Sequence, residues 1–403
     1  MTQMHCIETG NTAAATGVKL ARTQVIAAYP ITPQTPLTEK LSEFVAAGEM
    51  TAEYIPVESE HSALSVCIAA ASAGARTFTA TSANGLLYMH EQIHWAAGAR
   101  LPIVMCVANR GVGAPWSVWN DHQDSMSQRD TGWIQIHAAN HQQIIDTVIQ
   151  AFRIAETVRI PVMVCYDGYL LSHTYLPYDQ PEQEQVDAFL NGSVPRRLLD
   201  PTEPMNLNTV TLPYTRPDVR GETAPAYMEI RHDLQEDLDR TLAVVEKADK
   251  DYRAVFGRGG HPFFEAYRCE GAEFITVCLG SLSRQLRKVV DTLRSEGVKV
   301  GVIALRLYRP FPGRALAPAL ESARGVLVFE KAVSYGYEGP LTSELKAALY
   351  HCDRRPCLHN CIVGLGGRTI TTADLTKALA DFCADPESIR ALSPQWIGLA
   401  PLT

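Results

Sequence analysis

The residues from Val25 to Pro36 read "VIAAYPITPQTP". Four apolar residues open this stretch, which is typical of a short buried strand. Three prolines, Pro30, Pro33 and Pro36, then follow within seven positions. Because proline fixes φ and removes a backbone donor, neither a strand nor a helix can run through this segment. The sequence therefore predicts a strand that ends in a stiff loop, with Thr32 held between two of the prolines.

On both sides of this loop, residues 20–170 alternate short apolar runs with helix-like runs. The strand candidates are "QVIAAY", "AEYIPV", "RTFTAT", "LPIVMCVAN", "WIQIHA" and "IPVMVCY". The helix candidates are "LTEKLSEFVAAG", "SEHSALSVCIAAASAG", "NGLLYMHEQIHWAAG" and "NHQQIIDTVIQAFRIAET". Strands that are apolar throughout and alternate with helices indicate a parallel sheet covered on both faces. Ligands collect at the carboxyl ends of such strands, which is where the proline-rich loop lies.

The alternation stops and later resumes. Residues 171–222 are proline-rich, polar and weakly periodic, so they are interpreted as a connecting arm, and a helical stretch follows over residues 223–256. From "EFITVCLGS" through "KVGVIALRLY" and "RGVLVFEKA" to "TTADLTKALADF", strand and helix patterns alternate again. We therefore expect an α/β protein with two parallel-sheet domains, over residues 1–170 and 257–403, joined by an arm and helix over residues 171–256.

Composition narrows the class of protein. With 403 residues, a formal net charge of −8 and no run of Lys or Arg, the chain is unlike a nucleic-acid-binding protein. No apolar run approaches the roughly 20 residues of a membrane span, and the N-terminus lacks the features of a signal peptide. The 10 cysteines sit mostly within apolar runs, as expected for reduced, buried thiols. We therefore expect a cytoplasmic protein without membrane or nucleic-acid partners.

One cluster of possible metal ligands occurs within "YHCDRRPCLHNC". It contains His351, Cys352, Cys357, His359 and Cys361. The spacings between the cysteines can suit a metal, but the chain contains no CxxC pair. The run "CIVGLGG" also indicates a buried strand. We interpret the segment as a loop with incidental thiols, with a structural metal as the alternative, and the sequence leaves open whether these residues bind anything.

Three stretches carry a resemblance to a known family: "AAYPITPQTPLTEKL", "VESEHSALSVCIAAASAGARTFTATSANGLLYMHEQI" and "NDHQDSMSQRDTGWIQIH". They closely resemble the α subunit of the pyruvate:ferredoxin oxidoreductases and, more broadly, the 2-oxoacid:ferredoxin oxidoreductase family. The resemblance covers residues 5–180, is weak through the arm, and resumes over residues 270–370. It implies that the first domain is a thiamine diphosphate pyrimidine-binding domain and the second a transketolase C-terminal-like domain.

The resemblance also implies a function. The chain would be the α subunit of a multi-subunit enzyme that oxidatively decarboxylates pyruvate with coenzyme A to acetyl-CoA, CO₂ and reduced ferredoxin, or catalyses the reverse reaction. A β subunit would complete the thiamine diphosphate site and bring Mg²⁺ and a [4Fe–4S] cluster. Gamma and delta or fused subunits would bring further clusters, and ferredoxin and coenzyme A would be partners. This chain has no run of closely spaced cysteines for such a cluster.

By the same resemblance, Glu60 is the acid that hydrogen-bonds the aminopyrimidine ring of thiamine and stabilises its imino tautomer. Glu60 follows "AEYIPVES" at the carboxyl end of a predicted strand. An acid in the first turn of a helix also simply suits the helix dipole, which is the structural alternative. Glu58 lies close enough to be mistaken for the catalytic acid. Pro30 and Ile31 would form one wall of the thiamine pocket, and Thr32 would face the substrate.

Arg110 follows the strand "LPIVMCVAN", and the family places a substrate-carboxylate arginine at this strand end. A guanidinium can bind a carboxylate bidentately, although an interface salt bridge is the alternative. The polar loop beyond it contains Asn120, Asp121, His122 and Asp124. On spacing alone this loop is a solvated or interface loop, or a possible metal site. The resemblance implies that it lines the active site, without a chemical role for each residue.

Two motifs were set aside, and two other functions stay open. "YDGYLL", beginning at Tyr166, is similar to the start of a Mg²⁺-diphosphate motif, but its first glycine is replaced and "YLPYDQPEQEQ" does not read as the required strand, turn and helix. "GLGG", beginning at Gly364, is too short for a dinucleotide fingerprint. The missing diphosphate motif disfavours a stand-alone thiamine decarboxylase. The open alternatives are an enzyme of the same family for branched-chain, aromatic or dicarboxylic 2-oxoacids, and a non-catalytic scaffold subunit, against which Glu60 and Arg110 argue.

Overall fold

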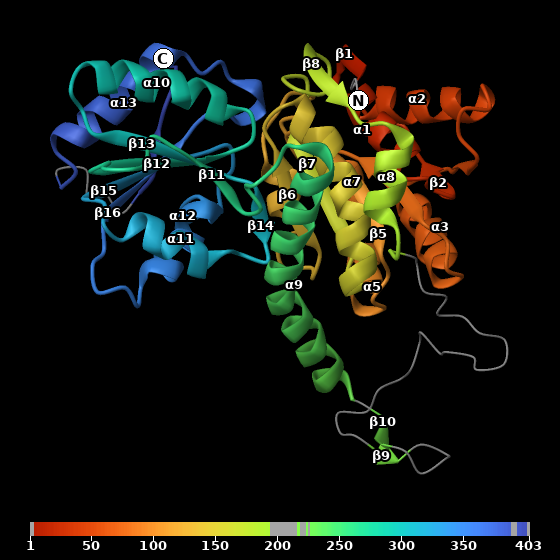
Figure 1. The fold of residues 1–403 in the computed structure, drawn as a ribbon. Coiled ribbons are helices and arrows are strands. Elements are labelled where there is room, and N and C mark those ends of the chain that lie inside the picture. Colours follow the sequence, from red (N-terminus) through yellow and green to blue (C-terminus); the bar gives the residue numbers. More distant parts are fainter. Residues whose placement is uncertain (1–3, 194–215, 218–222, 225, 388–392, 401–403) are drawn as a thin grey trace.

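The computed structural model describes residues 4–193, 216–217, 223–224, 226–387 and 393–400. Two sheets side by side form the cores of two α/β domains (Figure 1). The sequence-based prediction of an α/β fold with two parallel-sheet domains is confirmed, with one difference. Each sheet has one antiparallel edge strand, so both sheets are mixed.

The first sheet has seven strands, and the chain's first half supplies six of them. Their spatial order is β14 (Leu307–Arg309), β6 (Ile134–Ala138), β7 (Val162–Asp167), β5 (Ile103–Asn109), β4 (Thr77–Thr81), β2 (Val25–Ala28) and β3 (Glu53–Pro56). The helices between them are α1 (Gly10–Leu20), α2 (Thr35–Ala46), α3 (Glu60–Ser72), α4 (Ala83–Tyr88), α5 (His90–Gly98), α6 (Gln123–Met126) and α7 (His141–Val158).

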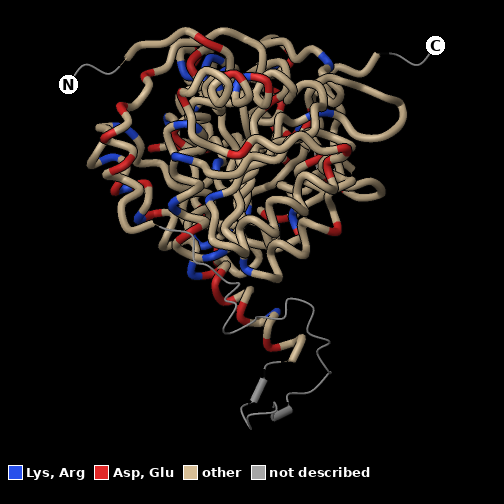
Figure 2. Tube along the Cα trace, turned by 90° about the vertical axis from the view of Figure 1, so that its right-hand side faces the viewer, with Lys and Arg blue, Asp and Glu red and all other residues tan. Residues whose placement is uncertain are grey.

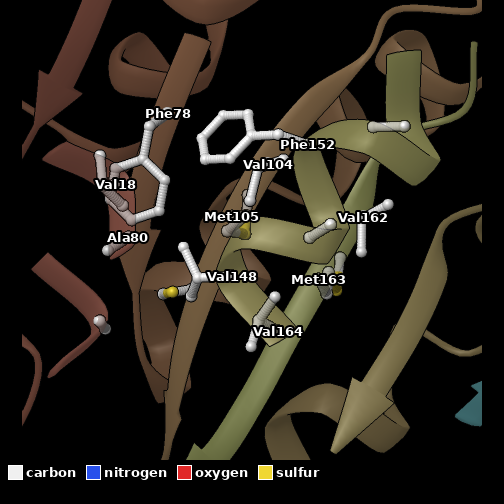
Figure 3. Close-up of a cluster of buried hydrophobic side chains, with 14 of the residues drawn as sticks. Val18, Phe78, Ala80, Val104, Met105, Val148, Phe152, Val162, Met163 and Val164 are labelled. Atoms are coloured by element: carbon white, nitrogen blue, oxygen red, sulfur yellow. The ribbon is translucent and has the colours of Figure 1, made fainter. Parts of the chain in front are cut away.

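The core of this domain lies between the central strands and the helices that cover them. Figure 3 shows side chains from α1, β4, β5, α7 and β7 meeting in one cluster, among them Val18, Phe78, Val104, Val148, Phe152 and Val162. Every residue of β4, β5 and β7 is buried, because helices cover these strands on both faces of the sheet. Burying one such side chain stabilises the fold by about 1.5–3 kcal/mol. The central strands are therefore a rigid base for the loops at their carboxyl ends.

The second sheet has six strands. Their order is β11 (Phe264–Tyr267), β13 (Val300–Leu305), β12 (Phe274–Leu279), β15 (Gly325–Glu330), β16 (Cys357–Ile362) and β17 (Gln395–Trp396). The accompanying helices are α10 (Leu282–Ser295), α11 (Gly313–Leu320), α12 (Pro340–Leu349), the 3₁₀ turn η1 (Leu365–Gly367) and α13 (Thr372–Ala384).

The expectation of a single strand over "KVGVIALRLY" is wrong. The chain leaves the second sheet at Leu305, and Leu307 pairs antiparallel with Ile136 at the edge of the first sheet. Leu305 is buried in a core of the second domain and Leu307 in the core of the first. Because both halves of the run are apolar, the sequence pattern does not show that they belong to different sheets.

Part of the expected arm is also regular structure. Strand β8 (Tyr175–Gln180) pairs antiparallel with β1 (Met4–Thr9), and helix α8 (Gln183–Leu190) follows directly. The interpretation that "YLPYDQPEQEQ" cannot form a strand, a turn and a helix was therefore wrong. A capping box between Glu182 and Gln185 starts α8, and the helix buries Val186, Phe189 and Leu190. Residues 194–215, the middle of the expected arm, lie outside the described residues.

Helix α9 (Tyr227–Phe256) crosses the first domain and confirms the helical stretch expected before the second domain. Its C-terminal half packs on α7 and buries Val245, Tyr252 and Phe256. Its N-terminal end, where Tyr227 and Met228 are exposed, projects away from the body of the molecule, whereas Leu234 is buried in the core of the first domain. Figure 2 shows residues of both charge signs along this end of the helix. The short strands β9 (Arg216–Pro217) and β10 (Thr223–Ala224) pair with each other beyond that end. Among the helices that the structure describes, none has the length and apolarity to span a membrane.

Candidate active site

The sequence-predicted residues gather at the carboxyl-terminal edge of the first sheet. Strands β2, β4, β5 and β7 are parallel, so their carboxyl ends meet at one edge. The proline-rich loop follows β2, helix α4 follows β4, and Arg110 follows β5 directly. The seam with the second domain lies beside this edge.

Glu60 opens helix α3 and is only 7% exposed. The helix begins there because the Ser59 side chain accepts a hydrogen bond from the amide of Ser62, at 3.2 Å. Within the described part of the chain, the only hydrogen-bond donor to the Glu60 carboxylate is its own amide, and burial raises the pKa of this carboxyl against that bond. Glu58 is exposed and bonds the hydroxyl of Ser62. Of the two acids, Glu60 is thus the buried one, and no side chain among the described residues bonds its carboxylate.

Helix α4 backs the Glu60 carboxylate. A Cβ atom at Gly85 would lie 2.4 Å from Oε1 of Glu60 and 2.6 Å from Oγ1 of Thr81. Only glycine fits at this position, because such contacts are far inside van der Waals distance. The hydroxyl of Thr81 is itself buried without a hydrogen-bond partner. A buried carboxylate without a side-chain partner among the described residues, beside an unsatisfied hydroxyl, is the chemistry expected where a polar ring binds.

Arg110 is 3% exposed, and two of its three guanidinium nitrogens already have partners. Its Nη1 donates to the carbonyl oxygen of Thr32 at 2.7 Å, and its Nε donates to the carbonyl oxygen of Ser117 at 2.8 Å. The indole of Trp116 lies against the guanidinium, 5.3 Å from Cζ to the ring centroid. Burial lowers the pKa of Arg110, and Asp124 and Tyr169 oppose this. Nη2 has no partner among the described residues, so a carboxylate would meet this nitrogen first.

The proline-rich loop presents its first residues outward. Pro30 and Thr32 are exposed, Ile31 is half-buried, and Pro33 is buried beneath them. The buried amide of Asn11 donates to the carbonyl oxygen of Pro33 at 2.9 Å, which fixes the loop from below. The structure therefore brings Thr32 and Arg110 together, as the sequence predicted, but through the backbone carbonyl of Thr32. Its hydroxyl is not used in this contact.

The polar loop beyond Arg110 is buried, so of the two sequence-based interpretations, a solvated loop or an interface loop, the solvated loop is wrong. The four residues singled out there are at most 6% exposed: Asn120, Asp121, His122 and Asp124. Asp124 bonds the amides of Ala83 and Arg110, within the first domain. The other three contact the second domain or the seam. Tertiary packing of two domains covers the loop, and local polarity cannot reveal that.

The seam contains a charged cluster around Asp167, the last residue of β7. Its Oδ1 lies 2.6 Å from Nε2 of His122, and its Oδ2 accepts from Nζ of Lys331 at 3.0 Å. The amide of Ser281 donates to Oδ2 at 3.0 Å, and Lys331 also donates to Oδ1 of Asn120 at 3.0 Å. Burial alone would raise the pKa of Asp167, but Lys331 and His122 outweigh it and hold this pKa well below its usual range.

Sequence reasoning missed Asp167, Ser281 and Lys331. Asp167 belongs to the "YDGYLL" motif, and each of the other two directly follows or nearly follows a strand of the second domain. A charged residue at the end of an otherwise apolar run, as in "VFEK", was the available signal. The Asp167 carboxylate is committed to Lys331 and His122 and is therefore not available as a metal ligand.

The "GLGG" segment contacts the same loop. The amide of Gly366 donates to Oδ2 of Asp121 at 3.1 Å, and the amide of Gly367 donates to the carbonyl oxygen of Asn120 at 2.8 Å. A Cβ atom at Gly367 would lie 2.4 Å from Cβ of Trp119. Burial raises the pKa of Asp121. The glycines thus let the second domain approach the active-site loop closely.

The possible metal ligands of the second domain do not converge. Strand β16 holds Cys357, His359 and Cys361, of which Cys361 is fully buried, whereas Cys352 precedes the strand. Within the described residues, no group of three or more His, Cys, Asp or Glu side chains is arranged to hold a metal ion. The ten cysteines all lie within the described residues and are reduced, without a disulfide bond among them.

Comparison with known families decides the assignment. Residues 16–237 match the model of the pyruvate flavodoxin/ferredoxin oxidoreductase thiamine diphosphate-binding domain, and residues 272–375 match core domain II of pyruvate:ferredoxin oxidoreductase. This chain belongs to the 2-oxoacid:ferredoxin oxidoreductase family. It is the α subunit of a thiamine diphosphate-dependent enzyme of that family, as the sequence predicted.

Curated relatives align over almost the whole chain. The pyruvate synthase subunit PorA of Methanothermobacter thermautotrophicus is 45% identical over 391 residues, covering 96% of this chain and 97% of the relative. The ketoisovalerate oxidoreductase subunit VorA of Pyrococcus furiosus is 46% identical over 376 residues, covering 93% and 92%. Relatives named for two substrates thus match this 2-oxoacid:ferredoxin oxidoreductase subunit equally well.

Solved structures share its fold. The 2-oxoglutarate:ferredoxin oxidoreductase from Magnetococcus marinus superposes with a TM-score of 0.69 at 20% identity, covering 94% of this chain and 66% of that one. A split-gene transketolase superposes with a TM-score of 0.54 at 13% identity, covering 93% and 97%. At such identities the likeness concerns the fold, and it agrees with the transketolase-like architecture expected for the family.

The residues present fit one half of thiamine diphosphate. At Glu60, a buried carboxylate without a side-chain partner among the described residues, backed by Gly85 and beside the unsatisfied hydroxyl of Thr81, suits an aminopyrimidine ring. The described residues offer no comparable group of ligands for a metal-bound diphosphate. This 2-oxoacid:ferredoxin oxidoreductase subunit therefore has the chemistry of the pyrimidine side of the site.

Proposed function

We propose that this α subunit acts on pyruvate, in a complex that converts pyruvate and coenzyme A to acetyl-CoA, CO₂ and reduced ferredoxin, or catalyses the reverse. The observation that carries the proposal is the Glu60 carboxylate, which is buried and has no side-chain partner among the described residues. It lies at the same sheet edge as Arg110. A scaffold subunit would have no use for an unpaired buried acid, because such a group costs stability.

Each residue of this edge has a role in the proposal. Thiamine diphosphate, when bound, supplies the carbon nucleophile that adds to the 2-oxo group. Glu60 hydrogen-bonds the pyrimidine ring and holds or moves a proton there, which a raised pKa and a dry setting favour. Pro30 and Ile31 form a wall of the pocket. Arg110 binds the substrate carboxylate through Nη2, and the hydroxyl of Thr32 donates a hydrogen bond beside it.

Partner subunits complete the enzyme. We propose that a β subunit binds Mg²⁺ and the diphosphate and carries a [4Fe–4S] cluster, and that gamma and delta or fused subunits carry further clusters toward ferredoxin and help to bind coenzyme A. The names of the relatives, which are subunits, support such an assembly. The commitment of Asp167 to Lys331 supports a diphosphate anchor outside this chain. The free thiols favour the reducing cytoplasm as the location.

The choice of pyruvate follows from the surroundings of Arg110. Trp116 lies against one face of the guanidinium and offers an apolar neighbour for the methyl group of a small substrate. A dicarboxylate such as 2-oxoglutarate would need a second cation, and the proline-rich loop offers the neutral Thr32 instead. The VorA relatives make 2-oxoisovalerate the second candidate.

The test is to purify the native complex and to measure kcat/KM for ferredoxin reduction with coenzyme A. The substrates are pyruvate, 2-oxobutyrate, 2-oxoisovalerate and 2-oxoglutarate, and the α subunit is also purified alone as a control. We expect pyruvate to lead and the isolated α subunit to be colourless and inactive. A preference for 2-oxoisovalerate or 2-oxoglutarate would overturn the proposal that pyruvate is the substrate. Iron–sulfur absorbance in the isolated chain would overturn the proposal that only partner subunits carry clusters.

A further inference from the structure

Asp124 is a fully buried carboxylate with four hydrogen-bond donors. Oδ1 accepts from Nδ2 of Asn109 at 2.7 Å and from the amide of Ser125 at 2.8 Å. Oδ2 accepts from the amide of Ala83 at 2.9 Å and from the amide of Arg110 at 3.0 Å. One side chain on α6 therefore binds the ends of two different strands, β4 and β5.

The bond to Ala83 acts on the Glu60 side of the site. Ala83 is the first residue of α4 and has a φ of 45°, a left-handed conformation that is unfavourable for a residue with a Cβ atom. This turn directs the chain from β4 into α4, which places Gly85 against Glu60. An acceptor fixed on the Ala83 amide stabilises the turn and so keeps α4 behind Glu60.

The bond to Arg110 acts on the substrate side. The amide of Arg110 has its partner in Oδ2 of Asp124, while the Arg110 guanidinium reaches Thr32 and Ser117. The backbone at the end of β5 is thus fixed from the inside, which determines where the guanidinium can point.

We propose that Asp124 is the positioning residue that sets both walls of the active site, Arg110 on one side and the α4 backing of Glu60 on the other. The inference rests on the proposed function for the roles of Arg110 and Glu60. The hydrogen bonds that carry it do not depend on that function, so the two can be tested separately.

The substitution Asp124→Asn is a sharp probe because each oxygen accepts from two donors. In either orientation of the amide, its NH₂ group would face two N–H donors, one pair being Ala83 and Arg110. A matched control is Asp146→Asn, which changes another buried acid, on α7, whose partners include Gln142, Tyr252 and Arg258. That acid lies in the contact with α9 and not at the active site.

The first measurement is amide hydrogen–deuterium exchange of the native complex without substrate, read by mass spectrometry. We expect Asp124→Asn to speed exchange about tenfold or more in the peptides that contain Ala83 and Arg110, because both amides then face either an NH₂ group, which cannot accept, or a neutral amide oxygen, which accepts more weakly than a carboxylate. Asp146→Asn should leave those peptides unchanged while lowering the thermal midpoint. Unchanged exchange at Ala83 and Arg110 in Asp124→Asn would overturn the proposal, whatever the activity.

A second variant separates the two walls. Glycine adopts a positive φ without strain, so Ala83→Gly added to Asp124→Asn should restore the turn into α4 but not the support of Arg110. We expect Asp124→Asn to weaken thiamine diphosphate binding and to raise KM for pyruvate, each about tenfold. The double variant should recover normal thiamine diphosphate affinity, while its KM for pyruvate should stay raised. Recovery of both, or of neither, would overturn the assignment of two separate walls.

Cofactor affinity and KM distinguish the positioning role of Asp124 from the roles proposed for Glu60 and Arg110. Faster exchange in both peptides, with unchanged cofactor affinity and unchanged KM, would leave the hydrogen-bond network correct and overturn the roles proposed for Glu60 and Arg110. Unfolding of Asp124→Asn is detected by the thermal midpoint. The exchange is then measured in Asn109→Ala, which removes one donor to Asp124 and loosens its carboxylate. If Asn109→Ala exchanges like the wild type at Ala83 and Arg110, the proposal fails.

Discussion

The guanidinium of Arg110 donates a hydrogen bond from Nη1 to the carbonyl oxygen of Thr32, 2.7 Å away. A second bond, from Nε to the carbonyl oxygen of Ser117, holds the opposite side of the same group. One buried arginine therefore joins the loop after β2 to the loop after β5. Because the link to Thr32 runs through the backbone, the two residues can be probed independently.

Arg110→Lys keeps the positive charge and loses the planar fork. A single ammonium group cannot reach both carbonyl oxygens and a substrate carboxylate in the geometry that the guanidinium uses. We expect kcat/KM for pyruvate in the native complex to fall by about 1.5–3 kcal/mol, and further for Arg110→Ala. Arg153→Lys, on α7, is the control and should keep wild-type kinetics. Wild-type kcat/KM in Arg110→Ala would remove this residue from the pocket.

Thr32→Ala removes a hydroxyl and leaves the carbonyl that Arg110 binds. We expect kcat/KM for pyruvate to fall by about 1.5–3 kcal/mol, the worth of one hydrogen bond to a charged group, while the thermal midpoint stays near that of the wild type. Thr32→Ser should retain most of the activity. Equal kcat/KM for the Ala and Ser variants would show that the hydroxyl has no part in catalysis.

Glu60→Gln should leave assembly intact and slow C2 proton exchange of bound thiamine diphosphate by about a hundredfold or more, the usual size of a general acid–base effect. Exchange into deuterated solvent is followed by NMR after an acid quench. Glu58→Gln is the matched control, since Glu58 is exposed and bonds the nearby hydroxyl of Ser62. If the Glu58 variant is slow and the Glu60 variant is not, the two assignments must be exchanged.

Gly85→Ala should impair the site directly. The new methyl group would lie 2.4 Å from Oε1 of Glu60, so either the carboxylate or α4 must shift. We expect weaker thiamine diphosphate binding and a loss of activity. Gly98→Ala in α5 is the control, because its nearest neighbour is an ordinary 3.5 Å contact with Arg231. There the helix should gain about 0.5–1 kcal/mol in stability. Normal cofactor affinity in Gly85→Ala would mean that α4 does not back the bound ring.

The pair of Asp167 and Lys331 should couple the two domains. Removing one partner leaves a buried charge, so Asp167→Asn and Lys331→Met should each cost about 3–5 kcal/mol in unfolding free energy at neutral pH. Their double variant should recover about 0.5–3 kcal/mol as coupling energy in urea titrations. Additive losses would show that the pair does not interact.

The same pair predicts a pH dependence. The pKa of Asp167 is lower in the folded chain than its unfolded value, so its ionised carboxylate contributes stability that is complete above that unfolded value, about 3.9. This contribution is lost as the pH falls through the folded pKa. The stability difference between the wild type and Asp167→Asn should therefore be constant near neutral pH and shrink in strong acid. A difference that shrinks already above pH of about 5 would contradict the lowered pKa.

The amino-acid sequence by itself determined the local elements of this protein. Short, mostly apolar runs that alternate with helix patterns predicted β2, β4, β5 and β7, because strands covered on both faces carry few charged or strongly polar side chains. The prolines predicted where β2 stops. Glu60 and Arg110 were found because each stands next to the end of a strand, and a resemblance gave them a role. These signals lie within single segments, where periodicity and proline geometry act.

Only the tertiary structure decided which distant residues meet. Arg110 and Thr32 are 78 positions apart, and Asp167 and Lys331 are 164 apart. In the sequence, Asp124 is one acid in a polar loop. In the folded chain it accepts hydrogen bonds from Ala83 and Arg110, which follow two different strands. The sequence pattern likewise did not indicate that β14 pairs with the first sheet or that α8 is buried. Periodicity reports how one segment is buried, whereas a hydrogen bond between segments depends on where the chain brings a second segment, and that is determined by packing of the whole fold.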